Sequence, residues 1–474
     1  MHFVQYYLEC LSQASYMVGD ETTGRAVVVD PRRDVHIYTD DAEAAGLRIE
    51  RVIETHVHAD FLSGHLELAA RTGAAVSYGP GAEVDFPMEP LADGREFSLG
   101  EVTLRVLATP GHTPESISIV VCEHADDAVP YGVLTGDTMF IGDVGRPDLL
   151  SGAGISAEEL ARKLYRSLHE KLLGLPDETR VFPAHGAGSA CGKNLSTETQ
   201  STIGEQRRTN YALQPMTEDQ FVALVTEGQP LQPMYFSYDA RRNRQLHALL
   251  DEVDLPAPLT LHEVQARAAA GAVVLDTRDP MDFAAGHLRG SFNVGLHGRF
   301  AELGGEVLAP DRPVVLVSEP GTDLEAKVRL GRVGFDRVEG ALVDPLRVLL
   351  ENPDAVEPSS RLTVAEFEER RREVADLQVV DVRSPGETAG GAIPGAVAVP
   401  LPQLTERIAE LDPARPTVVY CASGYRSSIA ASVLAGDGFR DVSDLLGGYD
   451  AWKGQNGNDG RNSSHEQSSE VQPS

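Results

Sequence analysis

Two histidines and an aspartate lie close together in the stretch THVHADFLSG, at His56, His58 and Asp60. Neutral imidazole and carboxylate groups are the ligands that zinc and ferrous iron prefer. Three more groups of these kinds follow in the stretches TPGHTPESIS, LTGDTMFIGD and VFPAHGAGSACG, namely His112, Asp137 and His185. Six such groups in one half of the chain predict a metal site.

The candidate ligands all follow apolar runs that are typical of β-strands. We expect strands in FVQYYLE, RAVVVDP, RVIETH, VTLRVLATP, SISIVVCE, YGVLTGD and RVFPAH. A helix is predicted over residues 157–175, because leucine recurs there at every fourth position from Leu160 to Leu172. This alternation predicts an α/β domain over residues 1–213 with the ligands on loops after its strands. A helical connector over residues 214–256 would follow.

A second candidate site lies far downstream, in the stretch VVYCASGYRSSIAASVLAGDGF. An apolar strand leads into Cys421, a short loop follows, and a helix is predicted from about Ser427. Backbone N–H groups of such a loop and of a helix start attract anions. Together with Arg426 they would stabilise the thiolate form of Cys421, which is the nucleophilic form.

The second half of the chain contains an internal repeat. Its copies begin with LTLHEVQARAAAGAVVLDTRDP and LTVAEFEERRREVADLQVVDVRSP. Three residues of the first copy match residues 105 positions later, in the pairs Asp276 and Asp381, Arg278 and Arg383, and Gly290 and Gly395. A repeat of about 100 residues is a duplicated domain rather than a solenoid unit. We therefore expect two small α/β domains, over residues 257–352 and 360–455, and a disordered polar tail over residues 456–474.

The composition of the chain excludes several classes of protein and of partner. The chain has 474 residues and a net charge of −31, from 41 Lys and Arg against 72 Asp and Glu. This excess of negative charge argues against a nucleic-acid partner. The four cysteines are widely spaced, which favours a reducing cytoplasm over a disulfide framework. The first residues lack the pattern of a secretory signal, and no apolar run approaches the length of a membrane span, so we expect a cytoplasmic protein without a membrane partner.

The order HVHAD, TPGH, GD and PAH resembles the metallo-β-lactamase superfamily over roughly residues 1–213. This resemblance implies an αβ/βα sandwich. In dinuclear hydrolases of that superfamily, the second metal is held by the equivalents of Asp60 and His185 and by a histidine directly after the aspartate. Phe61 occupies the place of that histidine here. The resemblance therefore implies one metal rather than two.

The stretch GDTMFIGDVGRPDL also resembles the persulfide dioxygenase branch of the superfamily, in particular its bacterial members fused to rhodanese domains. That resemblance implies one Fe(II) per chain, held by the facial triad of His56, His112 and Asp137. It also implies three surrounding groups that orient the ligands, namely His58, Asp60 and His185. His58 has an alternative role as a ligand, because zinc members use it so. Phe61 either forms part of the pocket wall or is ordinary core packing.

Two further residues near the predicted metal site have competing interpretations. Arg146 in GDVGRPD would bind a carboxylate or phosphate of a thiol substrate. Its alternative is a buried salt bridge with Asp143 or Asp148. Cys191 would carry or contact sulfur near the metal. Alternatively, it is a loop cysteine without a role in the chemistry.

The Cys421 loop, with DVRSPGE before it and LGGYDAW after it, resembles a rhodanese domain. This implies that Cys421 carries sulfane sulfur as a persulfide. Phosphatase loops of related folds are one residue longer, which disfavours a phosphatase. Aligning RPVVLVSEPGTD with RPTVVYCASGYR places Ser318 opposite Cys421 and Asp323 opposite Arg426. Serine is a poor sulfur carrier and an acid repels anionic donors, so we expect the first copy to be inert.

Together these resemblances imply an α/β enzyme that oxidises a low-molecular-weight thiol persulfide with O₂ to sulfite. Cys421 would transfer sulfur among thiosulfate, sulfite and thiols. Two rival hypotheses remain, a glyoxalase II-like zinc thioester hydrolase with an appended sulfurtransferase, and a non-catalytic sulfur carrier or sensor. The branch resemblance also implies a homo-oligomer. The thiol carrier stays open among glutathione, coenzyme A and others.

Overall fold

The computed structural model describes residues 1–462, which form two compact units. The first unit comprises Met1–Asp254 together with Val328–Asp336. The second comprises Leu255–Lys327 and the residues from Arg337 onwards. Among residues 1–462, no helix combines the length and the apolar character that a membrane span requires.

Two six-stranded sheets form the centre of the first unit. The strands of the first sheet lie in the order β1 (His2–Leu8), β2 (Gln13–Asp20), β3 (Arg25–Val29), β4 (Arg48–Ile53), β5 (Ala75–Tyr78) and β6 (Glu89–Pro90). Those of the second lie in the order β12 (Ser201–Thr202), β11 (Arg180–Pro183), β10 (Gly132–Gly136), β9 (Ile117–Cys122), β8 (Thr103–Ala108) and β7 (Glu96–Ser98). β3 and β4 pair in parallel, as do β10 and β11, so their carboxyl ends share one edge of each sheet.

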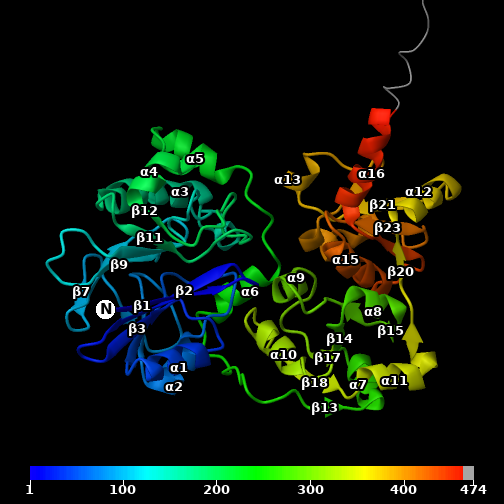
Figure 1. Cartoon of the computed structure of the whole chain (residues 1–474), viewed down its shortest axis with the longest axis horizontal. Coiled ribbons are helices and arrows are strands. Elements are labelled where there is room, and N and C mark those ends of the chain that lie inside the picture. Colours follow the sequence, from blue (N-terminus) through cyan, green and yellow to red (C-terminus); the bar gives the residue numbers. More distant parts are fainter. Residues whose placement is uncertain (463–474) are drawn as a thin grey trace, which may run out of the picture. The chain divides into compact units, whose positions relative to one another are not determined.

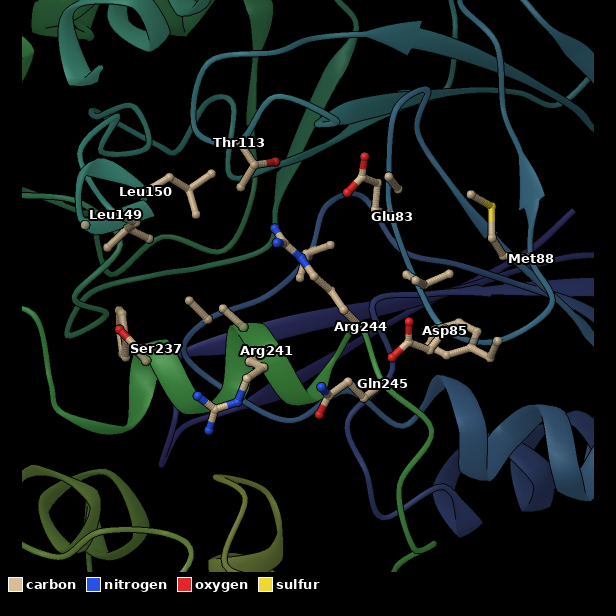
Figure 2. Close-up of a pocket in the computed structure, with 18 of the residues that line it drawn as sticks. Glu83, Asp85, Met88, Thr113, Leu149, Leu150, Ser237, Arg241, Arg244 and Gln245 are labelled. Carbon is tan, nitrogen blue, oxygen red and sulfur yellow. The ribbon is translucent and has the colours of Figure 1, made fainter. Parts of the chain in front are cut away.

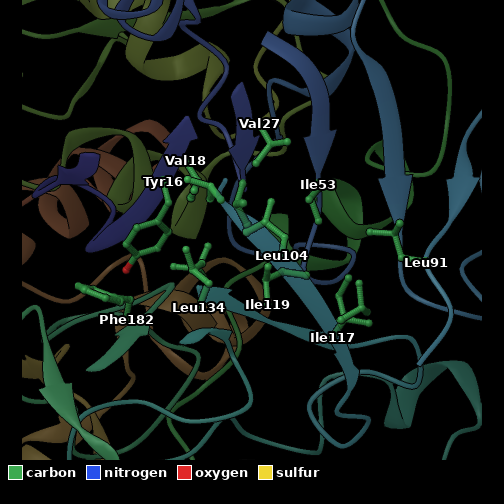
Figure 3. Close-up of a cluster of buried hydrophobic side chains, with 14 of the residues drawn as sticks. Tyr16, Val18, Val27, Ile53, Leu91, Leu104, Ile117, Ile119, Leu134 and Phe182 are labelled. Atoms are coloured by element: carbon green, nitrogen blue, oxygen red, sulfur yellow. The ribbon is translucent and has the colours of Figure 1, made fainter. Parts of the chain in front are cut away.

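The inner faces of the two sheets enclose an apolar core (Figure 3). Val18, Val27 and Ile53 from the first sheet pack in one cluster with Leu104 and Leu134 from the second. Burial of this apolar area contributes about 25 cal/mol per Å² and holds the sheets face to face. The packed sheets therefore give the ligand-bearing loops a rigid base.

Helices cover the outer faces of both sheets (Figure 1). They are α1 (His36–Ala44), α2 (His65–Thr72), α3 (Ala157–Arg166), α4 (Ile203–Thr209) and α5 (Glu218–Thr226). A further helix, α6 (Tyr235–Arg242), also belongs to this unit. Tyr38 of α1 and Leu68 of α2 share a cluster with Val28 and Val52 of the first sheet. Leu164 of α3 and Phe221 of α5 share another with strands of the second sheet. The unit is thus the αβ/βα sandwich that the sequence resemblance implied.

Two details differ from the expected elements of this unit. The helix predicted over residues 157–175 is regular only to Arg166 and continues as a π turn (Ser167–Lys171) and a 3₁₀ turn (Leu172–Gly174). Its leucine stripe is nevertheless buried, from Leu160 to Leu172. The segment expected to be a helical connector, residues 214–256, also does more than link two domains, because its helices α5 and α6 belong to the first unit.

The second unit contains two parallel five-stranded sheets with the same arrangement. The first sheet has the order β13 (Pro258–Leu259), β18 (Val338–Leu342), β17 (Val314–Val317), β14 (Val273–Asp276) and β16 (Phe292–Asn293). The second has the order β20 (Ser360–Leu362), β24 (Val442–Leu445), β23 (Thr417–Tyr420), β21 (Gln378–Asp381) and β22 (Val397–Ala398). A short pair, β15 (His287–Leu288) and β19 (Val356–Glu357), lies outside these sheets.

Helices follow the strands of both copies. The first copy has α7 (Leu261–Ala269), α8 (Pro280–Ala285), α9 (Phe300–Val307), α10 (Asp323–Gly331) and α11 (Pro345–Glu351). The second has α12 (Val364–Glu373), α13 (Pro385–Thr388), α14 (Leu404–Arg407), α15 (Tyr425–Gly436) and α16 (Gly448–Asn462). α16 extends into the tail that was expected to begin at residue 456, and residues 463–474 of that tail lie outside the described part.

Candidate metal centre and sulfur-transfer loop

Three of the predicted ligands converge where loops leave β4, β8 and β10. The Oδ2 atom of Asp137 lies 3.8 Å from Nε2 of His56 and 3.5 Å from Nε2 of His112. All three side chains are buried, and their ligand atoms lie within 4.8 Å of one another. The structure thus brings together two imidazoles and one carboxylate, the set that the sequence analysis assigned to the metal.

Hydrogen bonds fix which nitrogen of each imidazole faces this point. The Thr55 hydroxyl donates its one hydrogen to Asp30 Oδ2, at 2.8 Å. Since a hydroxyl has no second hydrogen, it must accept from Nδ1 of His56, at 2.9 Å. Nδ1 of His112 donates to the backbone carbonyl of Arg146 at 2.8 Å. Both Nε2 atoms are therefore left with a free lone pair, as metal ligation requires.

Two glycines make room for this arrangement. Gly136, at the end of β10, has a φ of 51°, and a Cβ there would lie 2.6 Å from the Thr55 hydroxyl oxygen. A Cβ at Gly145 would lie 2.0 Å from the Asp137 carbonyl oxygen and 3.0 Å from Nδ1 of His112. Larger residues would displace Thr55 or the ligands themselves.

The donor set fits a divalent metal. Nε2 of His56 and Oδ2 of Asp137 are buried and lack a hydrogen-bond partner. Burial lowers the pKa of both His56 and His112, so both imidazoles are neutral near pH 7. Buried polar atoms without partners are costly, and a metal ion would satisfy them. Ferrous iron and zinc both accept two imidazoles and a carboxylate.

A second group of possible ligands lies beside the first and consists of Asp60, His185 and Cys191. His185 bridges two carboxylates, with Nδ1 2.7 Å from Asp137 Oδ1 and Nε2 2.6 Å from Asp60 Oδ2. Burial opposes protonation of His185, but these carboxylates outweigh it and raise the pKa well above its ordinary value. Cys191 is buried, which raises the pKa of its thiol. The sequence analysis expected Cys191 near the metal, and the structure adds that its thiol stands with Asp60 and His185 as a third possible ligand.

His58 faces away from the first group. Its Nε2 lies 3.1 Å from Asp30 Oδ1 and 3.1 Å from Glu54 Oε2, in a third buried cluster. Burial lowers the pKa of His58, but Asp30 and Glu54 outweigh it and raise the pKa to about 10. Phe61 is fully buried and packs on the His58 ring with centroids 4.4 Å apart. The structure therefore favours a structural role for both residues.

Arg146 forms a buried salt bridge with Asp148, which was the alternative to the expected substrate contact. Its Nε and Nη2 donate to the two carboxylate oxygens of Asp148, both at 2.7 Å, and Nη1 donates to the carbonyl of Ala190 at 3.1 Å. The residue is 3% exposed. Its guanidinium is thus engaged within the protein, and its backbone carbonyl orients His112.

Sequence reasoning missed Asn243, which follows α6 and is buried. Its Nδ2 donates to the carbonyls of His58 and Phe61, both at 2.8 Å. Its Oδ1 accepts the N–H of Ser63 at 2.9 Å. One side chain therefore holds the loop at three points between His58 and Ser63. No local pattern could have revealed it, because the contact to His58 spans 185 residues.

The Cys421 loop has the predicted form. Cys421 follows β23 directly, and α15 begins four residues later. The N–H of Gly424 donates to the sulfur at 3.1 Å, and the sulfur lies 3.6 Å from the Ser427 hydroxyl oxygen. Gly424 has a φ of 107°, which lets the loop turn its N–H towards the sulfur. A negative charge on this sulfur would gain from these donors.

Arg426 is held by an ion pair. Its Nη1 and Nη2 donate to Glu387 at 2.8 and 2.5 Å. Burial raises the pKa of Glu387, but hydrogen bonds from Arg426 and the backbone of Ser384 outweigh it and lower the pKa to about 2. An anionic sulfur donor must therefore share Arg426 with Glu387. In the first copy, Ser318 follows β17 and Asp323 begins α10, as the alignment predicted.

Comparison with known proteins identifies the family to which the chain belongs. The profile of the metallo-beta-lactamase superfamily matches residues 8–185, and that of the rhodanese-like domain matches residues 260–339 and 363–455. The persulfide dioxygenase ETHE1, mitochondrial, of Bos taurus is 30% identical over 219 residues, which cover 44% of this chain and 75% of that relative. The chain belongs to the metallo-beta-lactamase superfamily. It carries two rhodanese-like domains after its metallo-beta-lactamase domain.

Two other superfamily relatives show how far the likeness extends. A beta-lactamase hydrolase-like protein of Xylella fastidiosa (strain 9a5c) is 32% identical over 248 residues, or 45% of this chain. The match covers only 52% of that relative, about half of its length. A crystal structure of a metallo-beta-lactamase from Staphylococcus aureus subsp. aureus COL superimposes with a TM-score of 0.65 and 32% identity, covering 72% of this chain and 98% of that one.

Proposed function

We propose that the first unit is a non-haem Fe(II) persulfide dioxygenase and that the last domain is a sulfurtransferase. One observation carries the proposal for the first unit: two neutral imidazoles and one carboxylate present free donor atoms to one buried point. This set has the composition of a 2-His-1-carboxylate triad, which leaves positions on iron for substrate and O₂. The relative named persulfide dioxygenase supports this choice of chemistry.

The proposed reaction is RSSH + O₂ + H₂O giving RSH and sulfite with two protons. One Fe(II) per chain, held by His56, His112 and Asp137, would bring the persulfide sulfur and O₂ together in a fixed geometry. Thr55 and the Arg146 carbonyl keep the two imidazoles in the ligating tautomer. The His185 imidazolium, between Asp137 and Asp60, would neutralise carboxylate charge beside the reacting groups.

The second reaction uses Cys421. Its thiolate would attack the outer sulfur of thiosulfate, forming a Cys421 persulfide while the S–S bond of thiosulfate breaks and sulfite leaves with the electron pair. A thiol or sulfite would then accept the sulfane sulfur. The Gly424 N–H, 3.1 Å from the sulfur, would stabilise negative charge on it. Sulfite links the two reactions, because the first produces it and the second can use it.

The test is metal analysis of protein purified without oxygen, with O₂ uptake on adding a thiol persulfide. We expect about one iron per chain and sulfite as product. His112→Ala should lose both iron and O₂ uptake, because it removes a ligand. His124→Ala, which changes an exposed histidine of the same unit, should keep both. Two zinc ions per chain with thioester hydrolysis would overturn the proposal.

A zinc hydrolase is the second candidate function, and one observation favours it. The thiol of Cys191 lies with Asp60 and His185 and supplies a third possible ligand where Phe61 supplies none. A metal held there would give the two-metal site of hydrolytic chemistry. Cys191→Ser decides between these sites. We expect its iron content to match that of the wild type, whereas loss of one of two metals would favour the hydrolase.

A further inference from the structure

The two candidate sites differ in what surrounds them. The cavity of about 900 Å³ beside the HVHADF loop is lined by residues of the first unit (Figure 2). The Cys421 loop instead meets the first rhodanese-like copy, which has Ser318 in place of a nucleophilic cysteine. The hydroxyl oxygen of Tyr425, the first residue of α15, lies 2.7 Å from the carbonyl oxygen of Gly295 and 2.9 Å from that of His297. The inert copy therefore borders the sulfur-transfer loop.

The helix α9 of the inert copy begins shortly after this contact. It packs against the second copy at the 3₁₀ turn Leu401–Gln403. Every residue of α9 is buried except Glu306, which is partly exposed. Glu306 is therefore the residue of this helix that a substrate can reach.

Glu306 lies close enough to the sulfur-transfer loop to interact with its charges. Its carboxyl interacts electrostatically with the guanidinium of Arg426, and the same guanidinium interacts with Cys421. The side chain of Arg426 is 27% exposed, so it lies at the surface of the loop rather than beneath it. A carboxyl from one copy and a thiol from the other thus share one guanidinium neighbour.

Glu306 differs from the other acids around it in having no partner. Glu387 is paired with Arg426, and Glu302 accepts from Nη2 of Arg299 at 2.9 Å. Among residues 1–462, Glu306 has neither a hydrogen bond nor an ion pair. A partly buried carboxyl without a partner is costly in its charged form.

This environment makes both forms of the Glu306 carboxyl available near neutral pH. Burial raises the pKa of Glu306 to about 8, although Arg299 and Arg426 act in the opposite direction, and Glu302 adds to the rise. The turn Leu401–Gln403 brings no titratable group to α9. The carboxyl is therefore mostly protonated at pH 7, and a group with a pKa near the working pH is suited to proton transfer.

We propose that Glu306 of the inert copy is a catalytic residue of the active copy, which protonates the departing sulfite and deprotonates the incoming thiol. The inference rests on the proposed sulfur transfer through Cys421. It adds a proton carrier to that reaction, and it gives the copy without a nucleophile a part in the chemistry.

The proton returns to Glu306 over the two half-reactions. In the first, the Cys421 thiolate attacks the outer sulfur of thiosulfate, the S–S bond breaks, and sulfite leaves with the electron pair and takes the proton of Glu306 as HSO₃⁻. In the second, ionised Glu306 takes the proton of a thiol RSH. The resulting thiolate attacks the outer sulfur of the Cys421 persulfide and releases the Cys421 thiolate. The sum is S₂O₃²⁻ + RSH giving HSO₃⁻ + RSS⁻.

The first half-reaction is tested by following persulfide formation on Cys421 of the full chain by mass spectrometry over a range of pH. In the wild type, loading by thiosulfate should slow as the pH rises through about 8, because Glu306 loses its proton there. Glu306→Gln should load about tenfold more slowly below this pH and should lack the decline. Benzenethiosulfonate should load both proteins equally, because its sulfinate leaving group is a weak base and takes no proton.

The second half-reaction is tested by mixing persulfide-loaded protein, freed of donor, with a thiol. Discharge by glutathione should be about tenfold slower in Glu306→Gln, because no carboxylate takes the thiol proton. An aromatic thiol that is already ionised at the assay pH should discharge both proteins at similar rates. Glu306→Asp should keep the pH dependence of loading, because it keeps a carboxyl. Glu369→Gln, which changes an exposed glutamate of α12, should behave as the wild type throughout.

Three outcomes would overturn the role of Glu306. Equal slowing of Glu306→Gln with every donor and acceptor, at every pH, would show that Glu306 only supports the fold around the loop. Unchanged rates and pH profiles in Glu306→Gln would refute the proton transfer but leave sulfur transfer by Cys421 standing. A wild type that never forms the Cys421 persulfide would refute the sulfurtransferase function itself, and the role of Glu306 with it.

Discussion

In the second rhodanese-like copy Cys421 follows β23, and in the first copy Ser318 follows β17 at the equivalent place. Around these residues the two copies share a buried turn, in which Arg278 pairs with Asp276 and Arg383 with Asp381, at 2.5 and 2.7 Å. Each arginine also donates to a glycine carbonyl eight residues further on, at 3.0 and 2.8 Å. The helices α7 and α12 also begin with the same kind of capping box, formed by a threonine and a glutamate.

The loops after β17 and β23 are where the copies diverge. The second copy presents a thiol, a glycine N–H directed at it, and Arg426. The first presents a hydroxyl, and Asp323 where the arginine would be. Since the sheets and salt-bridged turns are the same, the fold does not depend on the identity of the loop. The comparison indicates that the ion-paired turn supports the fold of both copies, whereas the proposed sulfur transfer depends on a few loop residues that differ between them.

Exchange of the nucleophile has the largest expected effect. Cys421→Ser should lower thiosulfate sulfur transfer about a thousandfold or more, because a serine hydroxyl is not ionised near neutral pH. Adding Ser318→Cys to this variant should not restore sulfur transfer, since Asp323 repels anionic sulfur donors. The assay is sulfur transfer from thiosulfate to cyanide. O₂ uptake of the same protein is the control and should be unchanged, whereas its loss would contradict separate sites.

Breaking the shared turn should destabilise both copies. Asp276→Asn and Asp381→Asn each leave a buried arginine unpaired, which costs about 3–5 kcal/mol. Hydrogen exchange of amides in each copy would measure the loss.

Only Asp381→Asn should also reduce sulfur transfer. Asp381 accepts the hydroxyl of Tyr420, the residue before Cys421, at 2.6 Å, whereas Val317 stands at the equivalent position of the first copy. Equal effects of the two variants on sulfur transfer would show that Tyr420 does not couple the turn to the loop.

The smallest expected effect concerns a contact between the copies. The Tyr425 hydroxyl lies 2.7 Å from the carbonyl oxygen of Gly295 and 2.9 Å from that of His297 in the first copy. Tyr425→Phe should cost about 1 kcal/mol and slow sulfur transfer a few-fold, because the loop loses a fixed point. Tyr165→Phe removes a similar tyrosine-to-carbonyl bond in the first unit and should not alter transfer. An unchanged transfer rate in Tyr425→Phe would show that the first copy does not support the loop.

Much of the fold was predictable, because strands and loops leave local patterns. All seven strands predicted in the first unit are present, and sheet packing buries their apolar runs except in β1, where Tyr6 alone is fully buried. β2 was missed, although all its residues are buried, because Gln13 and Ser15 interrupt its apolar character. Nε2 of Gln13 donates to the carbonyl of Asp30, and the hydroxyl of Ser15 pairs with that of Tyr38; neither partner lies near them in sequence.

The sequence by itself determined the types and order of the candidate metal-site residues, their place after strands, the duplicated domain and the cysteine loop. These depend on residue type and on spacing along the chain. The tertiary structure decided that His58 faces Asp30 and Glu54, that Arg146 pairs with Asp148, and that Asn243 holds the HVHADF loop. Which partner a buried polar group finds depends on distance in the fold, and several of these partners lie far apart in the chain.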